Sequence, residues 1–249
     1  SAEPFVKQSL IINEIMFSPL SGEPEYIELY NRSEAPISLL NWAITVGDDK
    51  TLLAQTDISV PAHAYVVTAG TKNFPDRYTL DKEQIIVPVT NLAALPASGS
   101  TLVLRDWVGT TIDSLAYTEL WGGGDGYSLE RIQPDAASDQ ATSWRTCVFV
   151  EGGTPGKINS VYNGDKPKKI RISAEPNPFL TDVSEHTTIT LEMPVTYARV
   201  TMKIYDSQGR LMITLLNNQP TGAHREVMWD GRDKNGQRVR MGIYIIFIE

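Results

Sequence analysis

Cysteine and histidine are scarce in this chain of 249 residues, which has one cysteine and three histidines. A single cysteine excludes an internal disulfide and a cysteine-rich metal site. Cys147 precedes Val-Phe-Val, which favours a small buried side chain over a nucleophile. His63, His186 and His224 stand in turns or at strand starts, outside any nucleophile-elbow or zinc-protease pattern. We therefore name no catalytic residue and expect that the chain is not an enzyme.

Long apolar runs are also missing, because none approaches the roughly 18 residues that a membrane-spanning helix needs. The first residues, Ser-Ala-Glu-Pro, lack the charged-then-apolar pattern of a signal peptide. The chain is therefore either cytosolic or a mature form from which a signal has been removed.

Positive charge is in short supply, since the net charge is −8 and its distribution is uneven. Residues 1–163 hold 10 Lys and Arg against 20 Asp and Glu, whereas residues 164–249 hold 12 against 10. Affinity for nucleic acid requires clustered cations. The acidic first part disfavours a nucleic-acid partner and is compatible with a cell-surface protein.

Helical periodicity is weak, and residues 92–97 offer at most one short helical turn. The 18 glycines and 15 prolines, together with many Val, Ile, Thr and Tyr, favour short strands and turns. Alternation or short apolar runs predict strands in the first part at 10–17, 26–30, 42–46, 64–68, 84–87, 101–105, 111–117 and 127–132. Many short strands at this spacing predict an all-β chain of two tandem immunoglobulin-like β-sandwiches.

The two sandwiches are separated by a polar stretch that contains Gly and Pro. We predict a first domain over 1–162, a linker over 163–169 and a second domain over 170–249. In the second domain, alternation over 200–204 and 211–215 around Asp-Ser-Gln-Gly predicts a hairpin. We also predict a second hairpin that runs from 226–229 through a turn at 230–236 to 242–247.

Four spaced motifs in the first domain carry a family resemblance. They are Ile-Ile-Asn-Glu-Ile at 11–15, Glu-Tyr-Ile-Glu-Leu-Tyr-Asn at 25–31, Gly-Tyr-Ser-Leu-Glu-Arg at 126–131 and Gly-Thr-Pro-Gly-Lys-Ile-Asn at 153–159. In this order they resemble the lamin tail domain in its bacterial extracellular form, over residues of about 8–160. The residues that carry the resemblance are Asn13, Glu14, Glu28, Asn31, Trp42, Glu130, Arg131, Pro155 and Gly156. The resemblance implies a β-sandwich and little chemistry.

The second domain resembles the FlgD-like immunoglobulin-like domain of the flagellar hook-cap assembly protein, over residues of about 170–249. Its signature includes Trp229, Asp230, Gly231 and Gly236, followed by Gly-Ile-Tyr at 242–244. Related domains stand at the C-termini of large secreted proteins. Such domains usually continue for one or two strands beyond the Gly-x-Tyr strand, so we expect that a C-terminal strand is missing. An open apolar edge invites strand pairing, which predicts a dimer through residues 243–248.

Acidic residues of the first domain are the candidate metal ligands. Glu14 and Glu28 belong to two of the motifs and are expected on neighbouring strands, where paired carboxylates could hold a hard cation such as Ca²⁺ or pair with Arg131. The competing and favoured interpretation makes them surface or salt-bridged strand residues. Asp48 and Asp49, in a turn, are weaker candidates, and no cofactor is expected.

Two tryptophans are candidate ligand-binding residues. Trp107 stands at a predicted hairpin tip, where it either contacts a partner or a sugar ring or folds back on its own sheet. Trp121 begins Trp-Gly-Gly-Gly-Asp-Gly, which lacks the Lys-Ser/Thr of a phosphate loop. This residue either caps the sandwich end or, with Asp125, forms a ligand platform.

These observations lead to one favoured function and two alternatives. We expect a non-catalytic interaction, adhesion or targeting module of a larger secreted, periplasmic or surface protein of a Gram-negative bacterium. Its partner would be another protein or the rest of its own polypeptide. The first alternative is a carbohydrate- or nucleic-acid-binding accessory module of a secreted hydrolase. The second is an unrecognised metal-dependent hydrolase around Glu14 and Glu28.

Overall fold

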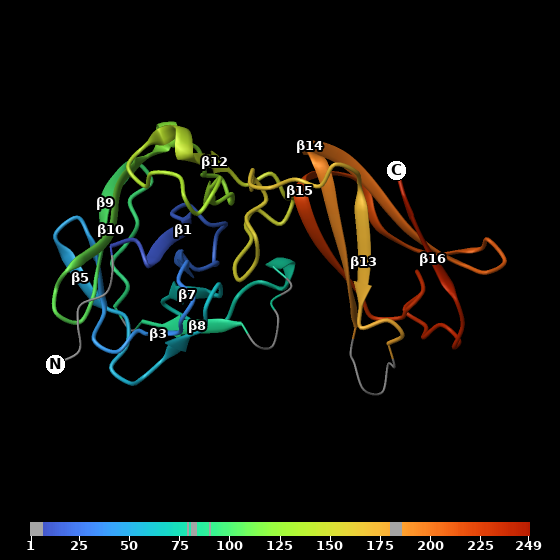
Figure 1. Ribbon diagram of the computed structural model, residues 1–249, viewed down its shortest axis with the longest axis horizontal. Helices are drawn as coiled ribbons and strands as arrows, with labels where there is room; N and C mark the ends of the chain where they lie inside the picture. The colour runs from blue at the N-terminus through green and yellow to red at the C-terminus, as the bar shows by residue number, and fades with distance from the viewer. Residues whose placement is uncertain (1–6, 79, 81–83, 90, 180–185) are drawn as a thin grey trace. The chain divides into compact units, whose positions relative to one another are not determined.

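The computed structural model describes residues 7–78, 80, 84–89, 91–179 and 186–249 (Figure 1). The chain divides into two compact units, which are described separately. The first comprises Ser1–Cys147 and Glu151–Val161, and the second comprises Val148–Val150 and Tyr162–Glu249. The domain bounds proposed from the sequence, with their linker at 163–169, stay a prediction.

Short strands build the first unit. The strands are β1 (Leu10–Met16), β2 (Tyr26–Asn31), β3 (Ile37–Ser38), β4 (Ala43–Val46), β5 (Asp49–Leu52), β6 (Ser59–Val60), β7 (Tyr65–Ala69), β8 (Ile85–Pro88), β9 (Gly99–Arg105), β10 (Thr111–Thr118), β11 (Leu129–Arg131) and β12 (Trp144–Thr146). Three short 3₁₀ turns join them: η1 (Asp76–Tyr78), η2 (Glu119–Trp121) and η3 (Ala141–Ser143). Eight of the strands lie at the segments that alternation or short apolar runs predict, whereas β3, β5, β6 and β12 were not predicted. Residues 92–97 form no helical turn, and the 3₁₀ turns lie elsewhere.

The strands of the first unit form two main sheets. One has six strands in the order β12-β11-β1-β2-β7-β8, and the other has four in the order β10-β9-β4-β5. Strands β3 and β6 make a small separate pair. Neighbours in the large sheet run antiparallel except β7 and β8, which are parallel. The all-β class predicted from the sequence is therefore confirmed.

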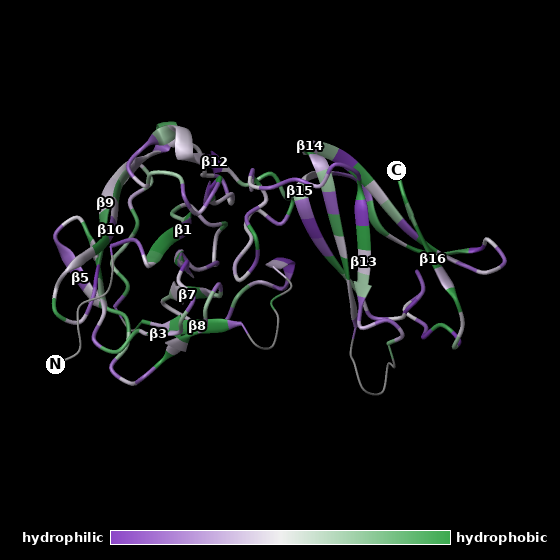
Figure 2. Ribbon diagram, viewed as in Figure 1, coloured by the Kyte–Doolittle hydropathy of each residue, from purple (hydrophilic) through white to green (hydrophobic). Residues whose placement is uncertain are grey.

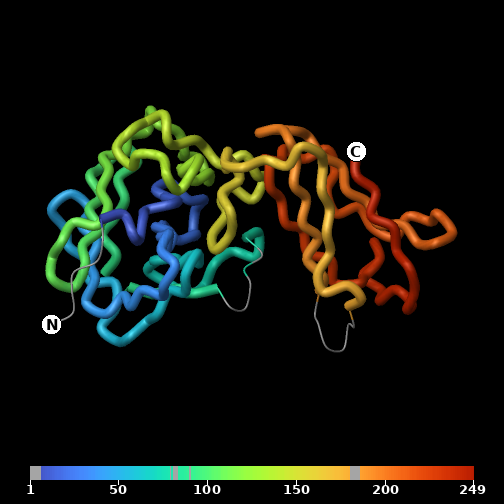
Figure 3. Tube along the Cα trace, viewed as in Figure 1, coloured from blue at the N-terminus to red at the C-terminus, as the bar shows by residue number. Residues whose placement is uncertain are grey.

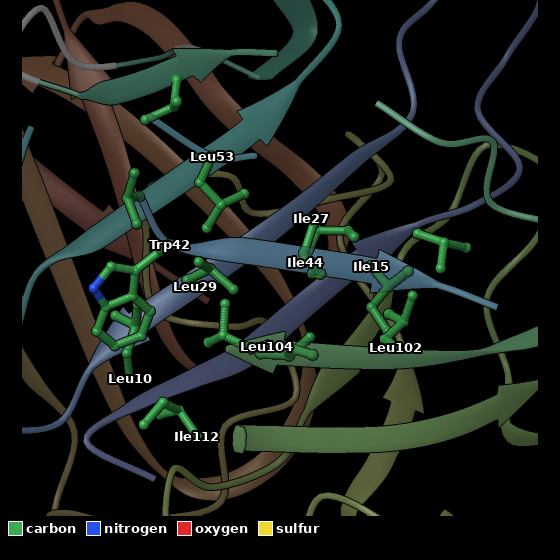
Figure 4. Packing of buried hydrophobic residues seen from close by; sticks show 14 of the residues in the cluster. Leu10, Ile15, Ile27, Leu29, Trp42, Ile44, Leu53, Leu102, Leu104 and Ile112 are labelled. Atoms are coloured by element: carbon green, nitrogen blue, oxygen red, sulfur yellow. The ribbon is translucent and has the colours of Figure 1, made fainter. Parts of the chain in front are cut away.

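The apolar side chains between the two sheets form the main core. Ile27 and Leu29 of the large sheet pack with Ile44 and Leu104 of the smaller one, and Trp42 lies at one side of them (Figure 4). All of these side chains are fully buried. Burial of apolar surface stabilises the folded state by about 25 cal/mol per Å². This layer of side chains therefore holds the two sheets together.

The large sheet is buried on its other face as well, which alternation alone does not predict. A β-bulge between Ile12 and Glu14 inserts Asn13 into β1. The bulge lets Ile12 and Ile15 both join the core, while Glu14 falls on the opposite face. There a second apolar cluster, which includes Met16, forms under η1 and the residues before it.

The second unit is built around one long hairpin. Its strands are β13 (Arg171–Glu175), β14 (Thr187–Asp206), β15 (Leu211–Trp229) and β16 (Tyr244–Ile248). β15 lies along β14, which pairs on its other side with β13 near its start and with β16 near its end. Register shifts between Glu192 and Tyr197 interrupt the hairpin midway.

Side chains of both halves of β14 meet in one core. Ile189 and Leu191 from the first half pack in the same cluster as Met202 and Ile204 from the second. The alternation is visible as banded colour along β14 and β15 (Figure 2). The hairpin therefore contributes to two facing layers, as in an immunoglobulin-like sandwich, and turns from one layer to the other at the register shifts.

The prediction of a second hairpin, from 226–229 to 242–247, is wrong. β16 pairs with β14 and not with β15, at Ile204↔Ile246 and Tyr205↔Ile245. Trp229, at the end of β15, meets the Tyr244 ring at 5.2 Å and 68° inside the core. The chain crosses to the other layer between these residues because this places both aromatic rings in the interior.

No helix in the part of the chain that the structure describes is long and apolar enough to cross a membrane.

Replacement of the core tryptophan tests the architecture of the second unit. Trp229 is buried between Phe179 and Tyr244 and donates its indole N–H to Arg232 O at 3.0 Å. We expect Trp229→Ala to lower the free energy of unfolding of this unit by about 3–5 kcal/mol, since it leaves a large cavity. Denaturant unfolding followed by far-UV circular dichroism measures the change. Trp107→Ala is the matched control and should cost under about 1 kcal/mol; equal losses would contradict this packing.

Candidate functional site

Three glutamates form a row across neighbouring strands of the large sheet, on the face away from the main core. Glu14 of β1 pairs in register with Glu130 of β11 on one side and with Glu28 of β2 on the other. All three are fully buried. We call Glu130, Glu14 and Glu28 the glutamate row. In the described part of the chain, no ion pair reaches any of them.

Residues 153–161, which we call the strap, cover the glutamate row. The strap can be followed in the yellow part of the tube in Figure 3. The Thr154 backbone N–H donates to Glu14 Oε1 at 2.9 Å, and the Gly156 N–H donates to Glu28 Oε2. Ser160 Oγ donates to Glu130 Oε2 at 2.6 Å. Each glutamate therefore accepts at least one hydrogen bond from the strap.

Asn159 ties the strap to the backbone of the sheet. Its Nδ2 donates to Asn13 O at 3.0 Å and to Arg131 O at 2.8 Å, and its Oδ1 accepts from Asn13 Nδ2 at 2.9 Å. Asn13 Nδ2 also donates to Glu28 Oε1 at 2.9 Å. The bulge residue thus links the strap to the glutamate row.

The Thr154 hydroxyl lies between two carboxyl groups. Its Oγ1 is 2.9 Å from Glu130 Oε1 and 3.2 Å from Glu14 Oε2. The same Oγ1 lies 3.4 Å from Asn159 Oδ1. A hydroxyl has one proton to donate, so a proton on one of the two glutamates lets both carboxyl groups bond to Thr154 Oγ1.

Burial raises the pKa of every member of the row. Desolvation raises the pKa of Glu130 to about 8, and repulsion by Glu14 adds to the rise. The pKa of Glu14 is raised and that of Glu28 is raised well above its ordinary value, in both cases chiefly by burial. Hydrogen bonds from the strap and from Tyr26, which donates to Glu14 Oε1 at 2.6 Å, oppose this rise without cancelling it.

A buried ion pair beside the row joins the two sheets. Arg131 lies 3.1 Å from Asp113 Oδ2, donates from Nε to Ile12 O at 2.8 Å, and stacks 4.8 Å from the Trp144 ring centroid. Burial lowers the pKa of Arg131 to about 10, which leaves it charged at neutral pH. Because Asp113 stands on β10 and Arg131 on β11, the pair joins the edge strand of the smaller sheet to the second strand of the large one.

The structure corrects the favoured interpretation of the two motif glutamates. Glu14 and Glu28 are neighbours, as expected, but they are neither surface residues nor salt-bridged, and Arg131 pairs with Asp113 instead. The reason is that the strap covers the strand face that alternation assigns to solvent. Within the described residues, no group of three or more His, Cys, Asp or Glu is arranged to hold a metal ion.

The other candidate site residues are spread over the first unit. Asp48 is exposed in the turn between β4 and β5, whereas Asp49, also exposed, is the first residue of β5 and pairs with Val46. Trp107 is 43% exposed in the turn between β9 and β10. Trp121 is half-buried against the main core, 6.5 Å from the Trp144 ring, while Asp125 is exposed with a φ of 53°.

Most of the remaining signature residues have structural surroundings. Asn31 is buried, and its Nδ2, which has two hydrogens, lies within hydrogen-bond distance of three backbone carbonyls, those of Ala35, Val60 and Pro61. The rest divide by exposure: Trp42, Pro155, Trp229 and Gly231 are buried, Gly156 is half-buried, and Asp230 and Gly236 are exposed.

The polar residues of the strap are the functional part of the site that sequence reasoning missed. The sequence analysis names none of Thr154, Asn159 and Ser160 as a site residue. Thr154 and Asn159 nevertheless belong to the Gly-Thr-Pro-Gly-Lys-Ile-Asn motif. The available signal was chemical, since that motif is rich in hydrogen-bond donors and the motif strands carry acceptors. Sequence spacing could not show that the two meet, because they are separated by up to 146 residues.

Comparison with known families agrees with this architecture. Residues 4–119 match the family model of the Lamin Tail Domain, and residues 178–249 match that of the FlgD Ig-like domain. The chain thus carries a lamin tail domain followed by an FlgD Ig-like domain, and the predicted tandem is confirmed. No curated protein matches the chain.

The chain also shows a distant likeness to solved glycosidase structures. An exo-β-D-glucosaminidase CsxA matches at 15% identity over 86% of this chain, with a TM-score of 0.21. An Amycolatopsis orientalis exo-chitosanase CsxA matches at the same identity and coverage, with a TM-score of 0.20. The chain spans 23% of the length of either protein. At such TM-scores these likenesses carry no functional conclusion.

The raised pKa of Glu130 predicts that stability falls as pH rises. In the folded state this carboxyl keeps its proton up to about pH 8, whereas an unfolded glutamate loses it near 4.5. The stabilisation is therefore complete below about pH 4.5 and is lost as pH rises through about 8. We expect the melting temperature to fall between pH 6 and pH 9, and Glu130→Gln, which mimics the protonated form, to flatten that fall. Asp49→Asn, at an exposed turn, is the control; identical pH profiles for all three proteins would contradict the assignment.

Proposed function

We infer that the chain is a non-catalytic interaction module of a larger secreted or cell-surface bacterial protein. The families that it matches support this class, and the FlgD-type match supports a bacterial protein that acts outside the cytoplasm. The buried carboxyl groups of the first unit are engaged in hydrogen bonds within the fold. That arrangement favours a structural role for the acidic motif residues.

Exposed apolar residues on β16 are the observation that carries the inference. Ile243, Ile245 and Phe247 alternate on the outward side of this segment and are 78%, 51% and 45% exposed. The intervening Tyr244, Ile246 and Ile248 pack into the core. A strand that is apolar on both faces is typical of a sheet interior, so β16 is suited to being covered by a partner.

The chemistry of β16 favours a second copy of the same strand as that partner. Among the described strands, β16 pairs with β14 alone, which leaves its other edge available. Antiparallel pairing of two copies about Ile246 would set each Ile245 opposite a Phe247. Pairs of an aromatic with a β-branched residue each contribute about 0.2–1 kcal/mol, and residues 241–248 carry no charge that would oppose association.

Charge placed on the outward side of β16 tests this interface. We expect the unaltered chain to dimerise in sedimentation equilibrium, and Ile245→Lys with Phe247→Lys to be monomeric at the same concentrations. Because both side chains point outward, the double variant should keep its melting temperature within a few degrees. Val108→Lys, at an exposed apolar site in the first unit, is the matched control. A monomer at every concentration in the unaltered chain would overturn the dimer.

A glycan-binding accessory module of a secreted hydrolase is the second candidate, and the β9–β10 turn favours it. Asp106 Oδ1 accepts from the Val108 and Thr110 backbone N–H groups at 3.1 and 2.8 Å, which makes the turn rigid. The turn presents Trp107 and the exposed Val108. An exposed aromatic ring on a fixed turn is suited to stack on a sugar ring.

Trp107→Ala separates the two candidates. If the turn binds sugar, retention on immobilised glycans such as chitosan should be lost at an unchanged melting temperature. Trp121→Ala serves as the comparison, since that ring packs on the core and its removal should lower stability instead. No retention of the unaltered chain on any glycan of an array would remove this candidate.

A further inference from the structure

The strap is the last segment of the first unit, and the chain passes from it into the second unit at Tyr162. Residues 148–150, which precede the strap, also belong to the second unit. What holds the strap on the sheet decides whether residues 153–161 cover the sheet or leave it.

The strap is held largely by the glutamate row, through donors spaced along its length. Thr154 contacts Glu14 and Glu130, Gly156 donates to Glu28, and Ser160 donates to Glu130. The Val161 N–H adds a bond to Glu130 Oε2 at 3.2 Å. Hydrogen bonds from Asn159 to backbone carbonyls complete the attachment.

The geometry of Thr154 makes a proton part of this attachment. Its hydroxyl lies near both the Glu14 and the Glu130 oxygens but has only one hydrogen to donate. When both carboxyl groups are ionised, one of them faces a lone pair of Thr154 Oγ1 and loses its bond. The arrangement of the atoms therefore favours a proton on this pair of carboxyl groups, and their raised pKa values agree with it.

Among the residues that the structure describes, no cation pairs with the row in place of the proton. The groups that face it from the packed elements are acidic or neutral; they are Tyr26, Tyr78 of η1, Cys147 and the three glutamates themselves. Arg131 is bound to Asp113, and Arg77 donates to Glu23, Tyr78 Oη and Gly126 O. Ionisation of the row therefore gathers negative charge in a site from which water is excluded.

Opening the strap relieves that charge, because it lets water reach the carboxylates. Buried like charges on directly paired strands repel strongly at low dielectric. The apolar side of the sheet stays packed against the main core, so the sandwich itself need not unfold. Opening one segment costs less free energy than unfolding the whole sandwich.

We propose that residues 153–161 act as a proton-held strap, which stays on the large sheet while the glutamate row holds its protons and leaves it when the row ionises. Release uncovers the face of the large sheet that carries the glutamate row. The proposal concerns the first unit alone, and it is independent of the interaction through β16.

The chain contains two natural reporters of strap release. Lys157 lies in the strap, half-buried, and trypsin can cleave after it only when the strap leaves the sheet. Cys147 is buried beneath the strap, with Ser160 Oγ 3.4 Å from its Sγ. Lys168 and Lys169, in the predicted linker, provide an internal control for protease activity.

The decisive experiment compares the full chain with Glu130→Gln at pH 9, with both proteins under identical conditions. We expect trypsin to cleave after Lys157 at least about tenfold faster in the unaltered chain, with equal cleavage after Lys168 and Lys169. Cys147 should react faster with a thiol reagent in the unaltered chain. Without strap release the opposite order is expected, because Glu130→Gln removes a negative charge that raises the pKa of the Cys147 thiol, and a lower pKa makes the thiol more reactive.

Near-UV circular dichroism distinguishes local release from unfolding. Equal cleavage rates at Lys157 in the two proteins would overturn the proposal, and so would cleavage that appears only as the dichroism signal is lost. Should Glu130→Gln fail to fold, Glu14→Gln takes its place, because its amide oxygen can accept from Tyr26 Oη and the Thr154 N–H while its amide nitrogen donates to Thr154 Oγ1. Protection at Lys157 in that variant supports the proposal, and its absence refutes it.

Discussion

Three carboxyl groups share one buried face of a sheet, and the rest of the first unit is arranged around that burial. Isolated ionised carboxylates are costly to remove from water, so the row is compatible with folding only if protons and donors reach it together. The strap supplies the donors, through Thr154, Gly156 and Ser160. Gly153 shows how closely the strap approaches, because a Cβ there would collide with Tyr26 Oη and Glu14 Oε1.

The bulge at Asn13 is the local device that makes this arrangement possible. Without the extra residue, strict alternation along β1 would place Ile12 and Ile15 on opposite faces. With it, both isoleucines enter the main core and Glu14 lies in register with Glu28 and Glu130. Asn13 then uses its amide to join Glu28 to Asn159. A single inserted residue thus serves the core, the row and the strap.

Eight strands of the first unit were predictable from the sequence because each carries its own signal, an alternating pattern or an apolar run between turn residues; β3, β5, β6 and β12, of two to four residues each, show no such pattern. What each strand face meets was not predictable in the same way. Glu28 alternates with Ile27 and Leu29, which is typical of a half-buried strand, yet the strap covers its polar side. The predicted pairing of β16 was wrong for a similar reason. The turn at 230–236 predicts a hairpin, but the aromatic rings of Trp229 and Tyr244 pack across the core from different layers.

The sequence by itself determined the all-β class, the position of eight strands in the first unit and the tandem of two families, because these follow from local periodicity and from motifs that are contiguous in the chain. The tertiary structure alone decided that Glu14, Glu28 and Glu130 form one buried row and that Thr154 stands between two of them. The physical reason is that the protonation and hydrogen bonding of a carboxyl group depend on its desolvation and neighbours. Those neighbours come from segments more than a hundred residues apart, which no local pattern records.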